Sequence, residues 1–281
     1  HYLRLEGAAE ELWTAARDHY QPLGFDGKLP ASELGRLLAV ADRLDTVAGL
    51  WAAGEVPSGS KDPFGMRRAA QGVVRTVAES GWNLDLRAAA DQAIAAASSR
   101  CDCQADAVLD EVTDFFSQRL RRYLVDVVGV AGDTADAVMS SSWAALPDTV
   151  ARARALEEER FAPEFRALAL AFKRVRNITD GHEPVEVDES LFVDQAETDL
   201  HHASRDFHQR LGELIAKRKV SEAFAAMGTL AEVLDRFFIE VLVMTDEPRI
   251  RANRIALLQF LGKDFLSLAD LSRLQIEGGD A

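Results

Sequence analysis

The side chains with the clearest capacity for chemistry in this sequence are basic, and they gather in three short stretches. Arginine suits phosphate groups because its planar guanidinium donates two parallel hydrogen bonds, and asparagine adds recognition of base edges. Each stretch predicts either a phosphate-binding surface or a set of ion pairs with the chain's many carboxylates, and both interpretations stay open. The stretches comprise Lys61, Arg67, Arg68 and Arg75; Lys173, Arg174, Arg176 and Asn177; and Arg249, Arg251, Asn253 and Arg254.

Paired acidic residues and histidines raise the question of a metal site. Asp42 and Asp45 are about one helical turn apart, so both carboxylates share a face that either holds a divalent cation or faces solvent. His201 and His208 share another face two turns apart, but zinc needs three or four protein ligands and no cysteine is close in sequence. We therefore predict no metal site and keep Asp42 as a candidate ligand only.

Other motifs do not support catalysis by this chain. Gly54 and Gly59 have the spacing of a phosphate-binding loop, but the lysine comes one residue late and no strand is predicted before it. The pair Cys101 and Cys103 has no second ligand pair nearby. Neither a Gly-x-Ser-x-Gly nor a His-Glu-x-x-His motif occurs. We predict no catalytic residue.

The elements that position these residues are predicted to be helices. Apolar residues recur every three or four positions, the period of an amphipathic helix. Asp62 and Pro63 predict an N-cap and a first helical residue, and Gly81 predicts the end of that helix. Alternating strand patterns are missing, so we predict an all-α fold. Helices are expected at about residues 34–51, 63–80, 108–123, 146–175, 194–216, 221–244 and 248–274.

Composition is that of an ordinary globular protein. The 281 residues are 48% hydrophobic and 28% charged, which excludes a wholly disordered chain. The net charge of −14 argues against a general attraction for polyanions, although a local basic stripe still acts under an acidic total. No apolar run approaches the roughly 20 residues of a membrane helix. Two cysteines separated by one residue indicate a reduced, intracellular protein, and the first residue, His1, indicates a piece of a longer chain.

A change in composition predicts one domain boundary. The sequence is alanine-rich from Ala88 to Ala97, and residues 98–103 are small and polar. We therefore expect two helical domains, spanning residues 1–100 and 105–281.

Six stretches of the sequence closely resemble the beta subunit of bacterial-type glycyl-tRNA synthetase. They occur in the family's order and extend over nearly the whole chain, and the most specific is the Lys-Asp-Pro-Phe-x-x-Arg-Arg run that begins at Lys61. The stretches are residues 41–49, 59–70, 173–178, 237–244, 251–258 and 268–275.

The resemblance implies an assembly of two alpha and two beta subunits that joins glycine to its tRNA with ATP. Catalysis, with ATP and magnesium, belongs to the alpha subunit, so no cofactor is expected in this chain, which looks like the C-terminal part of beta. Residues 1–100 resemble the end of an HD-type helical domain. Residues 105–281 resemble the DALR-like anticodon-binding bundle shared with arginyl-tRNA synthetase.

The resemblance also bears on Asp42, which matches the final aspartate of the HD metal-binding pattern. The other expected ligands, a histidine and a His-Asp pair, are not identifiable in the sequence. Because one or two carboxylates do not build a metal-hydroxide site, we interpret this part as a degenerate HD scaffold without the chemistry.

The leading hypothesis is a tRNA-binding region that positions glycine tRNA by its anticodon, with glycine tRNA and the alpha subunit as partners and neither DNA nor membrane. Its candidate contacts are the three basic stretches, except that Arg254 equally suits a buried carboxylate; Tyr123, Phe172 or Phe237 would stack on bases unless they belong to the core. The alternatives are an HD-type metal phosphohydrolase and a scaffold for subunit assembly. We expect a cytoplasmic location, with an organelle stroma or matrix left open.

Overall fold

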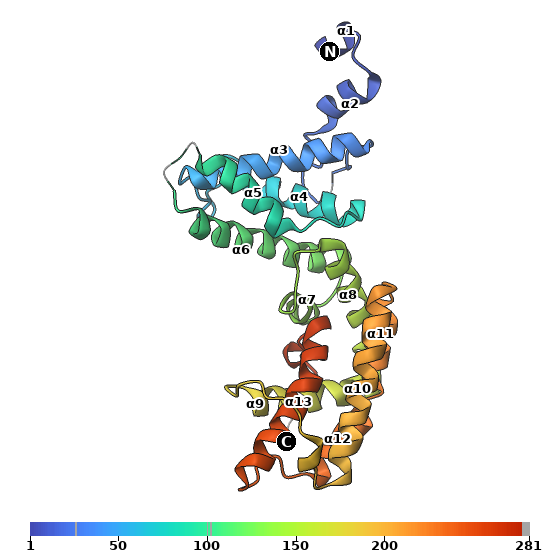
Figure 1. Ribbon diagram of the computed structural model, residues 1–281. Helices are drawn as coiled ribbons and strands as arrows, with labels where there is room; N and C mark the ends of the chain where they lie inside the picture. The colour runs from blue at the N-terminus through green and yellow to red at the C-terminus, as the bar shows by residue number, and fades with distance from the viewer. Residues whose placement is uncertain (26, 100, 102, 277–281) are drawn as a thin grey trace. The chain divides into compact units, whose positions relative to one another are not determined.

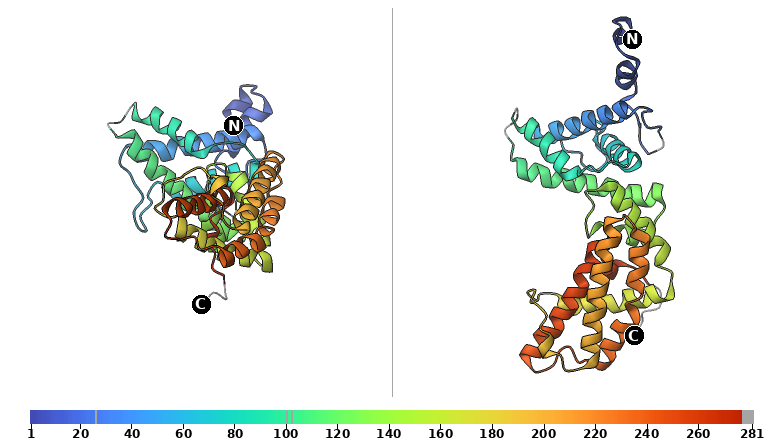
Figure 2. Two further views of the ribbon diagram at one scale, coloured as in Figure 1. Left: turned by 60° about the horizontal axis from the view of Figure 1, so that its bottom comes forward. Right: turned by 45° about the vertical axis from the view of Figure 1, so that its right-hand side comes forward.

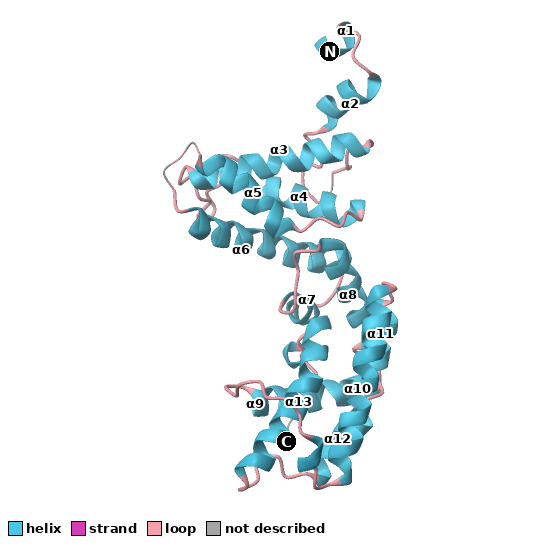
Figure 3. Ribbon diagram, in the orientation of Figure 1, coloured by secondary structure: helices cyan, strands magenta, loops and turns pink. Residues whose placement is uncertain are grey.

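The regular structure of this protein is helical. A computed structural model describes residues 1–25, 27–99, 101 and 103–276, and Figure 3 shows these residues as helices joined by loops. Within the described ranges no strand forms, and two isolated bridges, Ser58 with Lys61 and Asp85 with Ala145, are the whole of the β-type pairing. The predicted all-α class is confirmed. In the same ranges no helix is both long and apolar enough to span a bilayer.

The chain forms two compact units. The first contains His1–Gly129 and Trp143–Val150, and the second contains Val130–Ser142 and Ala151–Ala281. The helix α8 (Leu146–Glu159) begins in the first unit and ends in the second. Each unit has its own apolar core, so each is described by itself.

The first unit is built around α3, which packs against α2, α4 and α5, while α6 packs against α3, α4 and α5 (Figure 1). Its core side chains come from several of these helices, and Val47, Val73, Leu86 and Ile94, for example, are fully buried. The helices of this unit are α1 (Tyr2–Leu5), α2 (Glu10–Asp18), α3 (Glu33–Ala52), α4 (Met66–Ser80), α5 (Leu86–Ser98), α6 (Ala105–Tyr123) and the π-helical turn η1 (Leu124–Val128).

The division between the units lies later than the sequence analysis placed it. We expected a new domain from residue 105, but α6 belongs to the first unit. The Trp51 ring on α3 lies 4.8 Å from the Phe115 ring on α6, and Trp51 Nε1 donates to Glu111 at 2.8 Å. The small polar residues 98–103 therefore connect two helices of one core, and Arg100 and Asp102 lie outside the described residues.

The start of α4 also differs from the expectation. Pro63 is not helical, and the helix begins at Met66 after Gly65, whose φ of 69° is left-handed. Asp62 still caps it, because its two carboxylate oxygens accept the backbone N–H groups of Met66 at 2.8 Å and Arg67 at 3.0 Å. The predicted end at Gly81 is confirmed, with φ 67°.

The second unit is a bundle in which α10 lies beside α11, α12 and α13, and α9 packs on α11, α12 and α13 (Figure 2, right). Aromatic rings form its core: Phe172 lies 5.2 Å and Phe207 5.8 Å from Phe265. The elements of this unit are α7 (Gly132–Met139), α9 (Pro163–Thr179), η2 (Glu189–Leu191), α10 (Gln195–Ala216), α11 (Val220–Gly228), α12 (Ala231–Glu240), α13 (Pro248–Leu268) and η3 (Leu271–Arg273).

Three helices predicted in this unit are shorter than expected. The one expected over 146–175 divides at Pro163, which starts α9 because proline lacks the N–H that a helix interior needs. The one expected over 221–244 divides after Gly228, a poor helix former, and ends at Glu240. The last ends at Leu268, after which Asp270 N donates to Ala137 O at 2.9 Å.

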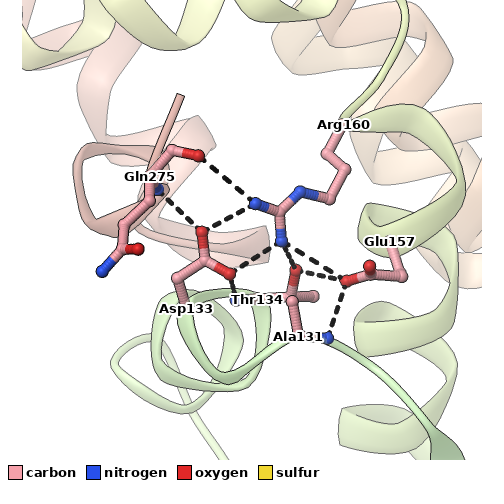
Figure 4. A network of polar contacts seen from close by, with 6 residues as sticks. All are labelled: Ala131, Asp133, Thr134, Glu157, Arg160 and Gln275. Atoms are coloured by element: carbon pink, nitrogen blue, oxygen red, sulfur yellow. Dashed lines mark hydrogen bonds and ion pairs between the residues drawn. The ribbon is translucent and has the colours of Figure 1, made fainter. Parts of the chain in front are cut away.

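A polar network ties α7 to the end of α8 and to the segment after η3 (Figure 4). Arg160 donates to both carboxylate oxygens of Asp133 at 2.7 Å, and Asp133 also accepts the backbone N–H of Gln275 at 2.7 Å. Thr134 Oγ1 donates to Glu157. Burial opposes ionisation of Asp133, but the bonds from Arg160 and Gln275 outweigh it, so the pKa of Asp133 lies below its ordinary value.

Candidate nucleic-acid interface

The last turns of α9 present the stretch Lys173–Asn177 at the surface of the second unit. The opposite side of α9 is apolar and buried, with Phe165, Leu168, Phe172 and Val175 at spacings of three and four. Burying that stripe directs the polar residues outward: Arg174 and Asn177 are exposed, while Lys173 and Arg176 are half-buried. The sequence placed this stretch at the end of a helix, and the structure does the same.

Arg174 lies over an aromatic ring. Its guanidinium carbon is 4.1 Å from the centroid of Phe238 on α12, in the geometry of a cation–π contact. Among the described residues no carboxylate forms an ion pair with Lys173 or Arg174. Both cations are therefore available to a phosphate, and the contact with Phe238 restricts the conformations of Arg174 without neutralising its charge.

Arg176 is only weakly engaged. Its Nε is 4.0 Å from Asp270 Oδ1, at the limit of an ion pair, and 41% of its side chain is exposed. Partly exposed pairs of this kind contribute about 0–1 kcal/mol. Arg176 thus retains most of its capacity to bind an external anion, and together with Lys173, Arg174 and Asn177 it forms what we name the α9 cationic end.

Arg254, by contrast, is an internal residue. Only 7% of its side chain is exposed; its Nε donates to Glu197 Oε1 at 2.9 Å, and its other nitrogens donate to Asp194 Oδ2 at 2.8 Å and Leu242 O at 2.9 Å. The expectation that Arg254 binds tRNA is therefore replaced by the buried-carboxylate alternative. Burial opposes ionisation of Glu197, but Arg254 and the backbone of Asp194 and Val193 more than compensate, so the pKa of Glu197 is lowered.

Asn253 is internal as well. Its Oδ1 accepts the backbone N–H of Asp188 at 2.8 Å, and its Nδ2 donates to the carbonyl of Asp188 at 3.0 Å, which fixes the segment before η2 to α13. The residue is 4% exposed, so it cannot read a base edge as expected. Arg251 is half-buried and donates to Thr245 O at 3.3 Å. The start of α13 therefore stabilises the bundle more than it offers a surface.

In the first unit, the predicted cluster divides into surface and internal residues. Lys61 and Arg68 are exposed. Arg67 donates to Gly59 O at 2.7 Å and Lys61 O at 3.4 Å, so it holds its own loop. Arg75 donates to the carbonyls of Gly24, Phe25 and Gly27 and pairs with Glu79 at 2.7 Å, which leaves 15% of its side chain exposed. Arg75 thus holds the segment before α3 in place. Its spacing of seven residues from Arg68, which predicts a shared helix face, does not make it a surface residue like Arg68.

The acidic pair weighed as a metal site is divided by a buried arginine. Asp42 and Asp45 are exposed. Arg43 between them points inward and donates to the carbonyls of His19, Ala39, Tyr20 and Pro22 at 2.7–3.1 Å. Within the ranges that the structure describes, no group of three or more His, Cys, Asp or Glu side chains is placed to hold a metal ion.

The histidines of α10 contact carboxylates of their own unit. His201 Nε2 is 3.1 Å from Glu189 Oε1, and His208 Nδ1 is 2.8 Å from Asp264 Oδ1. The cysteines are free thiols, and Cys103 Sγ lies 3.2 Å from Ser98 Oγ.

The aromatic residues proposed for base stacking are core residues. Phe172 and Phe237 are fully buried, and Tyr123 is 4% exposed. Phe238, one residue after Phe237, is half-buried and carries Arg174 over its ring, and the sequence analysis did not single it out. Its signal was present in the helical period: when Leu234 and Phe237 face the core, Phe238 lies at the edge of the apolar stripe.

Arg119 on α6 is a second residue that the sequence analysis missed. Its guanidinium lies 4.0 Å from the Phe115 ring. Burial and the nearby positive charge of Arg67 lower the pKa of Arg119. Arg67 and Arg119, which are distant in sequence, thus lie close together in the first unit. The packing of α4 on α6 brings them together.

Comparison with known protein families finds two matches. A family model described as "Glycyl-tRNA synthetase beta subunit" matches residues 1–140, and one described as "DALR anticodon binding domain" matches residues 168–269. The α9 cationic end lies within the second match.

Similar bacterial proteins carry the name glycine–tRNA ligase beta subunit. That of Anaeromyxobacter dehalogenans is 38% identical over 281 residues, that of Geobacter metallireducens 35% over 273 residues, and that of Ectopseudomonas mendocina 37% over 278 residues. These alignments cover 97–99% of this chain but 40% of each relative. The chain therefore spans about two fifths of the length of these relatives.

Proposed function

The chain belongs to the family of glycyl-tRNA synthetase beta subunits, and from this premise we propose that it is a tRNA-binding region that positions glycine tRNA through the anticodon. The α9 cationic end carries the proposal. It combines two cations without ion-pair partners, a weakly paired third and an exposed asparagine on a domain of the anticodon-binding type. RNA hairpin loops are held in this way, by phosphate contacts, stacking and base-edge hydrogen bonds.

The rest of the reaction is assigned to a partner. In this proposal the alpha subunit binds glycine, ATP and magnesium and performs aminoacylation, and two alpha and two beta subunits form the assembly. The first unit is then the end of a degenerate HD-type domain that acts as a scaffold. A cytoplasmic location is part of the same proposal, in line with the bacterial sources of the relatives.

The test is a comparison of two RNAs. Glycine tRNA and the same transcript with the anticodon of another amino acid are bound to the chain in a filter assay at several salt concentrations. We expect tighter binding of the glycine anticodon and a steep loss of affinity with salt. Equal, weak binding of both transcripts would overturn the proposal.

A second candidate function, contact with the partner subunit, is favoured by exposed apolar side chains in the last turn of α12 and in the segment just after it. Ile239 is 75% exposed, Leu242 71% and Met244 54%. Exposed apolar residues this close together are typical of protein contact surfaces. Light scattering of the chain with and without the alpha subunit tests this candidate, and Leu242→Asp is expected to weaken any complex. The phosphohydrolase alternative gains no support from the described residues.

A further inference from the structure

Arg174 is held in place by an aromatic ring and by no polar group. Its guanidinium carbon lies 4.1 Å from the centroid of Phe238 on α12. None of its N–H donors forms a hydrogen bond or an ion pair with the residues that the structure describes. Because a ring attracts a cation through its π face, Arg174 is oriented while its donors stay available to an external group.

Another arginine of this unit shows the difference. Arg160 also lies near a ring, 5.5 Å from the centroid of Phe161, but it donates to both carboxylate oxygens of Asp133 at 2.7 Å. Its position is fixed by bonds that use its donors and neutralise its charge. Arg174 keeps both its donors and its charge, which are what a phosphate needs.

The ring under Arg174 is fixed by the packing of α12. Leu234 and Phe237 of this helix are fully buried, and the Phe237 ring lies 5.7 Å from that of Phe238 in an edge-on geometry. The helix α12 packs on α9, and Phe238 is half-buried. Phe238 is therefore a fixed support for a side chain that projects from the other helix.

A fixed arginine binds a phosphate more tightly than a mobile one. The planar guanidinium donates two parallel hydrogen bonds to a phosphate only over a narrow range of orientations. A long side chain that becomes ordered only on binding loses conformational freedom, which weakens the complex by about two- to tenfold. With Phe238 beneath it, Arg174 has lost part of this freedom before any RNA is bound.

We propose that Phe238 is a positioning residue for tRNA binding, which holds Arg174 in the orientation suited to a backbone phosphate and does not itself contact the RNA. The inference rests on the proposed function. Phosphates carry no base identity, so the contribution of Phe238 is the same for every anticodon. It requires a ring, because an aliphatic side chain has no negative π face.

A double-mutant cycle tests this role. Glycine tRNA and the same transcript with another anticodon are bound to wild type, Phe238→Leu, Arg174→Ala and the double variant. We expect Phe238→Leu to weaken the binding of both transcripts by about three- to tenfold. In the Arg174→Ala background the same substitution should have no further effect. Phe238→Tyr, which keeps the ring, should retain the affinity of the wild type.

Phe161→Leu is the matched control. Phe161 is 67% exposed and also lies beside an arginine, but the donors of that arginine are bound to Asp133. This variant should bind both transcripts as the wild type does. Circular dichroism and thermal unfolding check that each variant folds, and Phe238→Met replaces Phe238→Leu if the latter does not.

The outcomes separate the positioning role from the proposed function. The role is overturned if Phe238→Leu binds as the wild type does, if its loss is equally large in the Arg174→Ala background, or if Phe238→Tyr binds as weakly as Phe238→Leu. A loss confined to the glycine anticodon also overturns it, since the ring would then contact a base. Equal, weak binding of both transcripts by the wild type would instead overturn the proposed function, and the coupling of Phe238 to Arg174 would still be measured with either transcript.

Discussion

Arg254 on α13 and Glu197 on α10 form a fully enclosed ion pair, with Arg254 Nε 2.9 Å from Glu197 Oε1 and side-chain exposures of 7% and 0%. Around this pair meet the first turn of α10 and the segment after α12, since Arg254 also donates to Asp194 and to Leu242 O. The pair is thus a joint between three elements of the bundle. Its position explains why an arginine in a strongly basic stretch is not available to RNA.

Removing the arginine should destabilise the protein. Arg254→Ala leaves the Glu197 carboxylate buried without its partner, which typically costs about 3–5 kcal/mol. We expect a corresponding fall in the free energy of unfolding by urea. Arg174→Ala, whose side chain is exposed, is the control and should change stability by less than about 0.5 kcal/mol. Unchanged stability of Arg254→Ala with weakened tRNA binding would contradict the internal role.

The pair of Asp133 and Arg160 predicts a loss of stability in acid. The pKa of Asp133 is lower in the folded chain than its ordinary value of about 3.9. The unfolded chain therefore binds the proton first, and the contribution of Asp133 is present above about pH 4 and is lost as the pH falls through the folded pKa. Urea unfolding across this range should show a shallower pH dependence in Asp133→Asn than in wild type. Parallel curves would contradict the prediction.

Two helical glycines predict opposite effects of the same substitution. A Cβ at Gly72 on α4 would lie 2.7 Å from Arg43 Nε, and Arg43 cannot yield because four carbonyls hold its guanidinium. Gly72→Ala should cost about 1–3 kcal/mol. A Cβ at Gly49 on α3 meets nothing within 4 Å, so Gly49→Ala should stabilise by about 0.5–1 kcal/mol. Thermal unfolding of both variants checks the contrast, and equal effects would show that Arg43 gives way.

The helical class and most helix positions follow from local sequence, because the 3.6-residue period and the signals at Asp62 and Gly81 act over a few residues. The division into units does not. Residues 98–103 have the composition of a linker, and only the contact of Trp51 with Phe115 shows that one core continues across them. A contact between residues this far apart leaves no mark in the local pattern.

Local sequence also fails to show which basic residues are accessible, because accessibility depends on contacts between residues distant in sequence. Arg174 and Arg254 both lie on helices in basic stretches, and neither stretch shows which arginine faces a carboxylate. Arg254 is buried because Glu197, 57 residues earlier, is placed opposite it. The contact of Arg174 with Phe238 is hidden for the same reason, since the two residues lie on different helices.

The salt dependence of tRNA binding tests the central claim most directly, namely that the α9 cationic end holds tRNA phosphates. Glycine tRNA is titrated at several salt concentrations with wild type, Arg174→Ala and the control Arg87→Ala, whose exposed arginine pairs with Asp110 in the first unit. We expect Arg174→Ala to weaken binding and to reduce the slope of log K against log salt by about 0.7–0.9, the value for one phosphate contact. Arg87→Ala should keep the wild-type slope. The same slope and affinity in Arg174→Ala as in wild type would contradict the account.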